Sequence, residues 1–430
     1  MQLYSTNDRS TTVSLREAVL SSLPRDGGLY MPREIKPLEK SFIQSISSLS
    51  FPEISYHVAH HLIGDSVPAA DLQDLILASI TFPAPVVPVT DRISSLELFH
   101  GPSLAFKDFG ARFMAQLMAH FNQEADETLT ILVATSGDTG GAVAAGFLNT
   151  PGIEVIILYP SGRVSALQEK QLTTLGGNIH ACEVAGSFDD CQKMVKEAFL
   201  DTRLASKYRL SSANSINIAR LIPQTFYFFE AYKQVDSDSI AFSVPSGNFG
   251  NLTAGLIAKK MGLPVSAFLA ATNANRVVPE YLRTGVFTPM SSISTVSNAM
   301  DVGNPSNFSR MLDLYSSTWN DMAEDVIGYS YNDEQTVRAI SRIAAESSYI
   351  TDPHGAIGYL AAQQFLSKES GHHVVFLETA HPAKFLDVVE EAISQKVEIP
   401  RRLAELAQRT KKATPLGTDY ADFRDFLLDR

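Results

Sequence analysis

The sequence is short of cysteine, of basic charge and of long apolar runs, and each shortage excludes a class of protein. Only Cys182 and Cys191 occur in 430 residues, so neither a disulfide framework nor a cysteine-based metal site is expected. Lysine and arginine number 35 against 47 acidic residues, a net charge of −12, which argues against a protein that wraps nucleic acid. No apolar stretch approaches the roughly 18 residues of a membrane span. The opening MQLYSTNDRS lacks signal-peptide character, so we expect a cytoplasmic protein.

The length and composition predict an enzyme-sized protein of two or three domains. Hydrophobic residues make up 45% of the 430 residues, enough for a large core. Residues 1–80 read as a mostly helical region with loops. A proline-rich stretch, TFPAPVVPV at 81–89, reads as an extended connector, because prolines cannot donate to a strand ladder. We place a domain boundary near 80–95.

After this boundary, short apolar runs alternate with helical patterns. Strands are predicted at 130–135, 155–158, 179–184, 240–244, 265–271 and 374–377. Helices are predicted at 142–148 and 165–175, from 252 onward, and near 333–347 and 355–367. This alternation predicts an α/β fold with parallel sheets flanked by helices. In such folds ligands bind at the carboxyl ends of the strands.

Lys107 lies in an apolar segment, LELFHGPSLAFKDFGARFM. Apolar neighbours disfavour the ammonium form and lower the pKa of a lysine, which yields the free amine that attacks a carbonyl. The alternative is a lysine that lays its stem along apolar surface with its charge in water. This segment by itself favours the alternative.

The segment SIAFSVPSGNFGNLTAGLIAKKMG reads as a strand, a glycine turn and a helix. Gly247 and Gly250 permit backbone conformations that direct successive N–H groups at one point, and the following helix adds the positive end of its dipole. The turn matches neither the P-loop nor the GxGxxG pattern. It predicts either a phosphate site without metal or an ordinary capped turn, and the two readings stay open.

A second turn of the same kind occurs in TILVATSGDTGGAVAAGF. Hydroxyls and N–H groups at 135–141 converge on a helix start, where a carboxylate would bind. Simple capping by Ser136 or Thr139 is the alternative, and it is favoured for this turn alone. Two such turns and an apolar lysine in one α/β chain favour a ligand with two anionic groups.

Two further segments supply candidates. SANSINIAR places Ser215 and Arg220 near a helix start, where arginine is suited to a forked contact with phosphate. A capped helix with an arginine facing solvent is an equal alternative. In FLETAHPAKF, Thr379 lies at a strand end, and an ordinary turn is the reading that this segment alone favours.

Together these segments resemble threonine synthases of the longer, bacterial and fungal type, within the fold-type II pyridoxal-phosphate enzymes. The resemblance covers nearly the whole chain, from Gly27-Gly28-Leu29-Tyr30 through FHGPSLAFKDFG, ATSGDTG, LQEKQLTTLGGNI, SANSINIARL, VPSGNFGNLTAG, SNAMDVGNPSN and TAHPAKF. It implies the tryptophan synthase β-like fold with an extra N-terminal domain at 1–80. The catalytic region would cover 81–430, with a smaller α/β subdomain at roughly 110–215 inserted in the larger one.

The resemblance also implies a role for each candidate residue. Lys107 would bind pyridoxal 5'-phosphate as a Schiff base and act as the catalytic base. Thr379 would hydrogen-bond the pyridine nitrogen. The cofactor phosphate would bind Gly247, Asn248, Phe249, Gly250 and Asn251. The substrate carboxylate and the cofactor oxygen would lie by Ser136, Asp138 and Thr139, and the substrate phosphate by Asn214, Ser215 and Arg220. Shorter relatives have Asn in place of Asp138, so its bond to the cofactor oxygen does not carry over unchanged. No metal is expected.

The implied reaction converts O-phospho-L-homoserine and water to L-threonine and phosphate, by γ-elimination followed by addition of water at Cβ. One alternative is a phospholyase that shares the early steps and releases a 2-keto acid. Another is a metabolite-binding protein without catalysis, which the retained Lys107 disfavours. The sequence does not decide between a monomer and a homodimer, and it indicates neither a nucleic-acid nor a membrane partner.

Overall fold

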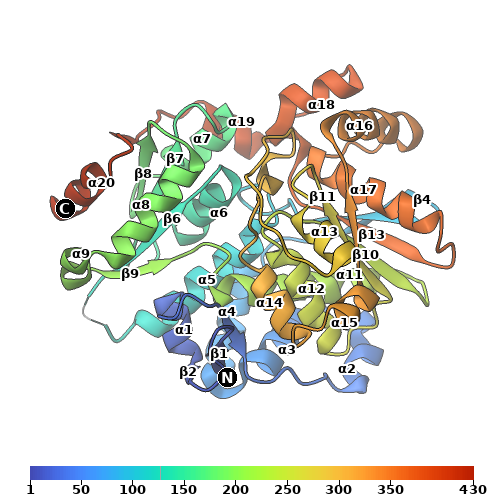
Figure 1. Ribbon diagram of the computed structural model, residues 1–430, viewed down its shortest axis with the longest axis horizontal. Helices are drawn as coiled ribbons and strands as arrows, with labels where there is room; N and C mark the ends of the chain where they lie inside the picture. The colour runs from blue at the N-terminus through green and yellow to red at the C-terminus, as the bar shows by residue number, and fades with distance from the viewer. Residues whose placement is uncertain (126) are drawn as a thin grey trace.

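Two parallel sheets form the two halves of the molecule in a computed structural model that describes residues 1–125 and 127–430 (Figure 1). The larger sheet has six strands. In spatial order they are β12 (Val326–Ser330), β11 (Ala267–Thr272), β10 (Ile240–Pro245), β13 (His373–Glu378), β5 (Ile93–Glu97) and β4 (Val86–Thr90). All pairings are parallel except that of β4 with β5 at the edge. The predicted strands at 240–244, 265–271 and 374–377 are confirmed.

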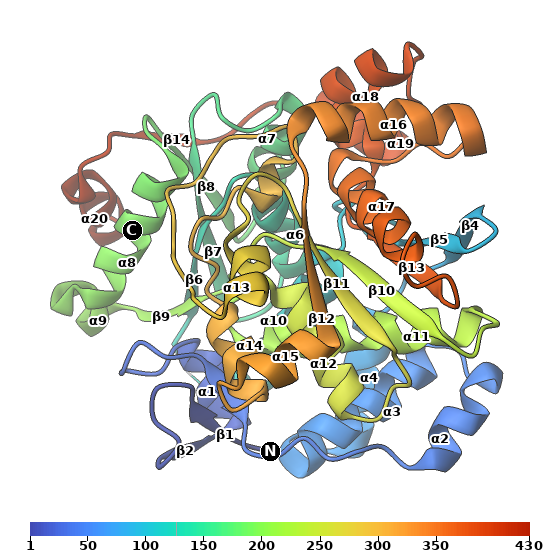
Figure 2. The ribbon, with the colours of Figure 1, turned by 45° about the vertical axis from the view of Figure 1, so that its right-hand side comes forward.

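The centre of this sheet is buried on both faces. Every residue of β10 and β11 is buried, so their sequences read as continuous apolar runs rather than alternating ones. Three helices cover one face: α17 (Pro353–Leu366) packs on the central strands, and α16 (Asp333–Ser347) and α18 (Leu386–Ile393) lie outside it (Figure 2).

The prediction of a plain connector at 81–89 was wrong for its second half. Residues from Val86 onward form β4, whose Pro88 is exposed and lies beside a register shift at the sheet edge. An edge strand tolerates a proline because the missing N–H would have faced solvent.

The second sheet has five parallel strands. Their order is β14 (Thr414–Leu416), β8 (Ile179–Val184), β7 (Ile153–Pro160), β6 (Leu129–Ala134) and β9 (Arg209–Ser212). The predicted strands at 130–135, 155–158 and 179–184 are confirmed. One outer helix, α8 (Phe188–Leu200), packs on β6 and β7, and α20 (Tyr420–Leu428) packs on α8. The end of the chain therefore returns to this sheet.

Residues 1–80 form a third layer beneath both sheets, blue in Figure 1. The predicted helices are present as α1 (Leu15–Ser21), α2 (Lys40–Ser45), α3 (Phe51–Ile63) and α4 (Ala69–Ser79). A small antiparallel sheet of β1 (Gln2–Ser5), β2 (Thr12–Ser14) and β3 (Tyr30–Pro32) was not predicted. Its strands have three or four residues, too few to show a period of two.

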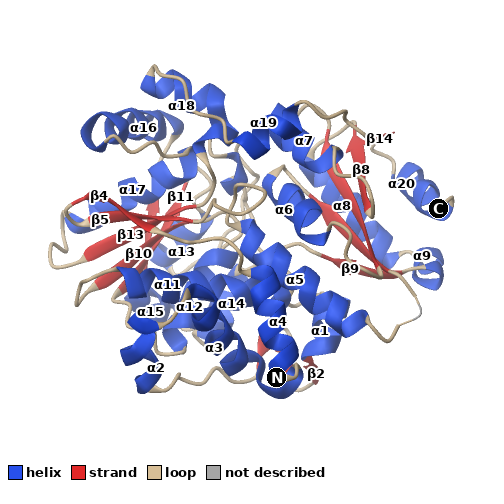
Figure 3. Ribbon diagram, turned by 180° about the vertical axis from the view of Figure 1, so that it is seen from behind, coloured by secondary structure: helices blue, strands red, loops and turns tan. Residues whose placement is uncertain are grey.

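Helices between the two sheets join them into one core. The strands stand in two groups with α5 (Lys107–Asn122) and α6 (Asp138–Phe147) between them (Figure 3). One hydrophobic cluster runs through this region from the N-terminal helices to both sheets. Of the described helices, none is both long and apolar enough to cross a membrane.

The remaining helices connect these layers or cover them. They are α7 (Ala166–Thr173), α9 (Thr202–Lys207), α10 (Ile218–Leu221), α11 (Phe226–Gln234), α12 (Gly250–Lys260), α13 (Val277–Thr284), α14 (Phe308–Leu314), α15 (Trp319–Asp325) and α19 (Arg401–Ala407).

Candidate active site

Lys107 is the first residue of α5, and a short backbone bridge places it beside the end of β13. Phe106 N–H donates to Thr379 O at 2.8 Å, and His381 N–H donates to Leu104 O at 3.0 Å. Leu104 adopts a left-handed conformation with φ 59°, which turns the chain into the helix. The structure therefore brings together Lys107 and Thr379, which are far apart in the sequence.

The surroundings of Lys107 favour the neutral amine. Burial lowers its pKa, and the positive charges of Lys384 and Arg220 lower it further against the carboxylates of Asp138 and Asp352. Its Nζ lies 5.0 Å from the centre of the Phe106 ring, and its side chain keeps some accessible surface. Of the two sequence readings, the lowered pKa favours an amine that can act as a nucleophile, and the role of Lys107 stays a prediction.

The glycine turn after β10 directs backbone groups at the start of α12. Phe249 has φ 59°, a left-handed conformation that is unusual for a bulky residue and is held here by full burial. Asn251 ties the turn to the strand: Ser246 Oγ donates to its Oδ1 at 2.7 Å, and its Nδ2 donates to Pro245 O at 2.8 Å. The side chain of Asn251 is thus committed to the protein, and only backbone N–H groups remain for a phosphate at this position.

Packing, as well as the approach of a ligand, explains why residue 247 is a glycine. A Cβ there would lie 2.7 Å from Ala299 O and 2.7 Å from Met300 Cα. Any side chain would displace the segment that covers the turn, so substitution of Gly247 does not test ligand binding by itself. A Cβ at Gly250 would make only ordinary contacts, the nearest at 3.5 Å.

Asn248 joins the glycine turn to the SANSINIAR segment. Its Oδ1 accepts from Ser306 N at 2.7 Å, which fixes the amide orientation, and its Nδ2 donates to Ser215 Oγ at 3.2 Å. Asn214 donates from Nδ2 to Ala134 O at 3.1 Å, at the end of β6. The two sheets therefore meet at the SANSINIAR segment.

Arg220 is a buried cation with donors to spare. It is 4% exposed, its Nη1 donates to Ala213 O at 3.1 Å, and its Nε has no hydrogen-bond partner. Burial lowers the pKa of Arg220 to about 10, which still leaves it charged at neutral pH. A buried cation without a carboxylate in contact is costly unless a ligand supplies the anion. The sequence alternative of an arginine facing solvent is therefore wrong.

The turn before α6 leaves two hydroxyls unengaged. Thr135 Oγ1 accepts from Gly137 N at 3.0 Å and from Gly140 N at 2.8 Å, so Thr135 caps the helix start rather than Ser136 or Thr139. Ser136 and Thr139 are partly exposed, and within the described ranges their side chains make no hydrogen bond to protein. They remain free to bind a ligand carboxylate.

Asp138 is held in a buried ion pair that sequence reasoning missed. Lys384 Nζ lies 2.6 Å from its Oδ1, and Gln168 Nε2 donates to the same atom at 2.9 Å. Burial raises the pKa of Asp138, but the charges of Lys384 and Lys107 outweigh it and hold the pKa well below its usual range. Lys384 is the lysine of the quoted TAHPAKF segment, but nothing in that segment indicates its burial or its partner.

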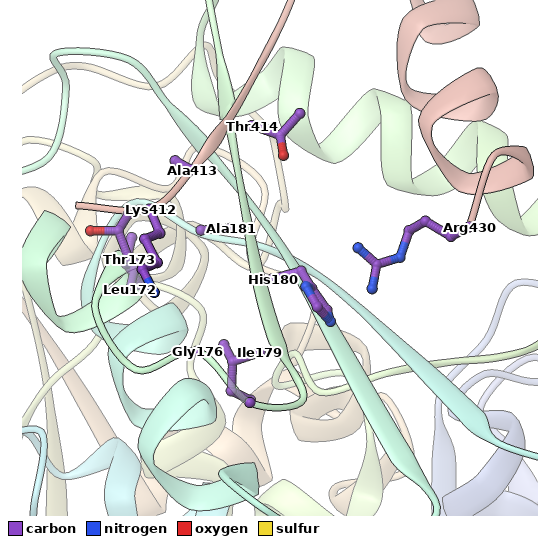
Figure 4. Close-up of a pocket in the computed structure, with 11 residues that line it drawn as sticks. Leu172, Thr173, Gly176, Ile179, His180, Ala181, Lys412, Ala413, Thr414 and Arg430 are labelled. Carbon is purple, nitrogen blue, oxygen red and sulfur yellow. The ribbon is translucent and has the colours of Figure 1, made fainter. Parts of the chain in front are cut away.

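A surface pocket of about 360 Å³ lies away from these residues, between α7, β8 and the end of the chain (Figure 4). Its basic lining residues are His180, Lys412 and Arg430. Glu154 already pairs with His180 at 3.0 Å and with Arg430, so much of that charge is balanced. The pocket contains none of the predicted site residues, and we assign no function to it.

The groups around Lys107 fit pyridoxal phosphate. They include an amine with a lowered pKa, a helix start that can hold a phosphate, and the hydroxyl of Thr379, which forms no hydrogen bond to the described protein. Within the described residues, no group of three or more His, Cys, Asp or Glu is arranged to hold a metal.

Comparison with known proteins agrees with this fit. The family profile described as "Pyridoxal-phosphate dependent enzyme" matches residues 95–379. Profiles described as "Threonine synthase N terminus" and "Threonine synthase, C-terminal" match residues 2–80 and 355–427.

Individual relatives match along their full length. Threonine synthase from Serratia marcescens is 44% identical over 100% of this chain and 99% of its own. The crystal structure of threonine synthase from Escherichia coli superimposes with a TM-score of 0.93 and 41% identity, covering 100% of both chains. The pyridoxal-phosphate-bound threonine synthase from Brucella melitensis gives 0.93 and 33% identity, covering 99% of this chain and 98% of that one. The chain therefore belongs to the threonine synthases, pyridoxal-phosphate-dependent lyases of the α/β fold described above.

Proposed function

We propose that the substrate is O-phospho-L-homoserine and that Arg220, Ser215 and Asn214 bind its phosphate. The observation that carries this proposal is the buried guanidinium of Arg220, which lacks an anionic partner and has an unused Nε. A phosphate dianion would offset that charge and accept the remaining N–H groups, in the geometry that arginine favours.

Lys107 would carry the cofactor and then move protons on the substrate. Bound pyridoxal phosphate supplies an electron-accepting ring that stabilises negative charge at the substrate Cα. Lys107 Nζ, whose pKa burial lowers, would take the proton from Cα. A second proton would leave Cβ as the Cγ–O bond breaks and phosphate departs. Cγ would then gain a proton, water would add its hydroxyl at Cβ, and a proton would return to Cα to give threonine.

The other site residues would orient the two ligands. The backbone at Gly247, Asn248, Phe249, Gly250 and Asn251 would hold the cofactor phosphate, and the Thr379 hydroxyl would face the ring nitrogen. Ser136 and Thr139, whose hydroxyls are unengaged, would bind the substrate carboxylate. Asp138 would act through its pair with Lys384, as a charge fixed beside Lys107.

We also propose a domain division at residue 80. Residues 1–80 would be an N-terminal domain and residues 81–430 the catalytic region, with 110–215 as the inserted subdomain. The division is supported by the profile match at 2–80 and by the second sheet, whose strands β6 to β9 lie within 110–215.

The experiment is a product analysis joined to one variant. Purified protein given O-phosphohomoserine should form threonine and inorganic phosphate in equal amounts, measured by chromatography and a phosphate assay. Accumulation of a 2-keto acid instead of threonine would contradict the proposal and favour a phospholyase.

Arg220→Ala tests the phosphate assignment. Loss of a charge-assisted bond costs about 1.5–3 kcal/mol, and about 1.4 kcal/mol is a factor of ten. The KM for O-phosphohomoserine should therefore rise ten-fold or more, while cofactor content stays unchanged. Arg283→Ala, at an exposed ion pair with Glu280, is the matched control. A variant that binds substrate normally, or that loses its cofactor, would show that Arg220 lies in another site.

A further inference from the structure

Residues 1–80 anchor loop 211–217, the segment that runs from the end of β9 and carries Asn214 and Ser215, two of the residues that we assign to the substrate phosphate. Ser22 follows α1, which packs against β9. Its Oγ accepts from Ser212 N at 2.8 Å and donates to Ser212 O at 2.9 Å. One hydroxyl from residues 1–80 thus satisfies both backbone groups of Ser212, the last residue of β9.

The backbone of Ser22 is strained at this contact. Ser22 has φ 66° and is 1% exposed. A left-handed conformation in a residue other than glycine costs on the order of 1–3 kcal/mol and persists only where the surroundings fix it. The bonds to Ser212 are part of what fixes it, so the position of the hydroxyl is tightly determined.

Asn217 connects Ser22 to α10, the short helix that contains Arg220. It is fully buried, and its Nδ2 donates to Val19 O at 2.9 Å and to Ser22 Oγ at 2.9 Å. Its Oδ1 accepts from Ala219 N at 3.0 Å and so caps α10. A shift of Ser22 would therefore move the start of α10.

A second buried cation, Arg310, holds the middle of the loop from behind. Its side chain is 0% exposed, and no Asp or Glu of the described chain lies within ion-pair distance of it. Its guanidinium donates to Ser215 O at 3.0 Å and to Ile216 O at 2.7 Å, and also to Tyr30 O at 3.1 Å in β3. Burial lowers the pKa of Arg310 to about 9, so it stays charged at neutral pH.

Arg310 also sets which atom of Ser215 is free. Its Nη1 donates to Asn307 Oδ1 at 2.7 Å, which turns Asn307 Nδ2 toward Ser215 Oγ at 3.3 Å. Asn248 Nδ2 donates to the same Oγ at 3.2 Å. With both lone pairs engaged, the hydroxyl hydrogen of Ser215 is the one group left to bind an anion, and it can only donate.

We propose that Ser22 and Arg310 are positioning residues for the substrate phosphate: through them the N-terminal domain fixes loop 211–217, and Arg310 adds a positive charge behind it. This assigns residues 1–80 a part in substrate recognition. It rests on the proposed function, since it takes Ser215 and Arg220 as the phosphate ligands.

The test compares Ser22→Ala with Ser21→Ala, a neighbouring exposed serine that donates to Glu17 O. The holoenzyme of each is assayed for KM, for kcat, for the inhibition constant of inorganic phosphate, for cofactor absorbance and for Tm. Ser22→Ala should raise the KM and the phosphate inhibition constant together, by about three- to ten-fold, as expected for lost buried hydrogen bonds. The kcat and cofactor absorbance should match those of Ser21→Ala.

Two further variants separate paired effects. Ser22→Gly separates the loss of the Ser22 hydroxyl from the strain in its backbone, and Arg310→Lys separates the positive charge of Arg310 from its contacts with the loop. Ser22→Gly relieves the left-handed strain but lacks the hydroxyl, so it should lose phosphate affinity as Ser22→Ala does. Arg310→Lys keeps a charge but loses the contacts to the two loop carbonyls, and it should weaken phosphate binding more than substrate turnover. If Arg310→Lys does not fold, the Ser22 pair carries the test.

The outcomes are distinct. Folded Ser22→Ala protein with unchanged KM and phosphate inhibition overturns the proposal, and so does a loss confined to kcat or to cofactor binding. Ser22→Gly with the affinity of the unmodified chain overturns the role of the hydroxyl. Arg220→Ala is measured in parallel: if its KM is unchanged, the phosphate assignment itself fails, whereas a raised KM there beside normal Ser22 variants refutes only the anchor.

Discussion

At the scale of single residues, the site depends on charges that lack partners in the protein. Arg220 and Arg310 are buried without carboxylates in ion-pair contact in the described structure, and burial lowers the pKa of Lys107. Burying an unpaired charge is among the larger costs in folding, so each such group indicates a ligand or a compensating dipole. For Arg310 the compensation comes from backbone carbonyls.

Lys107→Ala should abolish turnover to background, because no other described amine occupies the start of α5. The absorption band of the lysine-bound cofactor should disappear as well, as measured in the visible spectrum of the purified protein. Lys396→Ala, at an exposed ion pair with Glu390, is the control and should keep both. Turnover at the level of the unmodified chain in Lys107→Ala would remove Lys107 from the site.

Sequence and structure agree best where a residue's chemistry is unusual for its neighbours. Lys107 among aromatic residues and Arg220 in SANSINIAR could be raised as candidates from the residues themselves, and the resemblance to known enzymes supplied their predicted roles. Ser22, Arg310 and Lys384 could not be raised in this way, because their roles arise from partners more than 90 positions away. A serine that follows a short helix or a lysine in a turn has no local signal until the fold supplies its partner.

At the scale of elements, α5 and α10 cross so closely that Gly110 of α5 packs directly against Arg220 of α10. A Cβ on Gly110 of α5 would lie 2.8 Å from Arg220 Nε and 3.0 Å from Arg220 O in α10. Gly110 therefore sets the distance between the first turn of α5, which begins at Lys107, and the guanidinium. The strands around this crossing were predictable because their buried runs are continuous. The four-residue helix α10 was predicted only as a helix start near Ser215 and Arg220, because four residues are too few to show a helical period.

Gly110→Ala should reproduce part of the Arg220→Ala effect without removing the arginine. Overpacking typically costs about 1–3 kcal/mol and displaces the nearest side chain. We expect a lower Tm and a raised KM for O-phosphohomoserine, with the cofactor still bound. Gly371→Ala, where a Cβ meets nothing within 4 Å, is the control. A normal KM in Gly110→Ala would mean that Arg220 can move without loss of substrate binding.

At the scale of the whole molecule, the Asp138–Lys384 pair links the two sheets. Asp138 begins the helix after β6 of the second sheet, and Lys384 follows β13 of the larger one. The fold class and the two turns were predictable, since each strand–turn–helix unit is local. The pairing of the sheets was not, because it depends on tertiary contacts between separate units.

Removing one partner of this pair should destabilise the protein more than removing both. Lys384→Met leaves a buried carboxylate and Asp138→Asn leaves a buried ammonium, each at a cost of about 3–5 kcal/mol. The double variant buries no charge at either position. Its free energy of unfolding should therefore be closer to that of the unmodified chain than is the value for either single variant. Denaturant unfolding of all four proteins measures the coupling. Additive losses would show that the two side chains do not interact.

The same pair predicts an acid dependence. Because the pKa of Asp138 is lower in the folded chain than its unfolded value of about 3.9, its stabilisation is complete above that pH and is lost as the pH falls through the folded pKa. Below about pH 4, the free energy of unfolding should decrease faster for the unmodified chain than for the double variant. The difference is at most about 1.4 kcal/mol per pH unit for one proton. Parallel slopes in acid titrations of both proteins would contradict this.

The anchor of loop 211–217 has a consequence for the order of folding. Its bonds join Ser22 to Ser212, 190 positions apart, and Tyr30 to Arg310, 280 positions apart. Contacts that close such long stretches of chain form late, after local helices and strand pairs. During synthesis the loop cannot be completed until Arg310 has left the ribosome. Phosphate affinity would therefore be among the last properties that a newly made chain acquires, and a nascent protein would not compete with finished molecules for substrate.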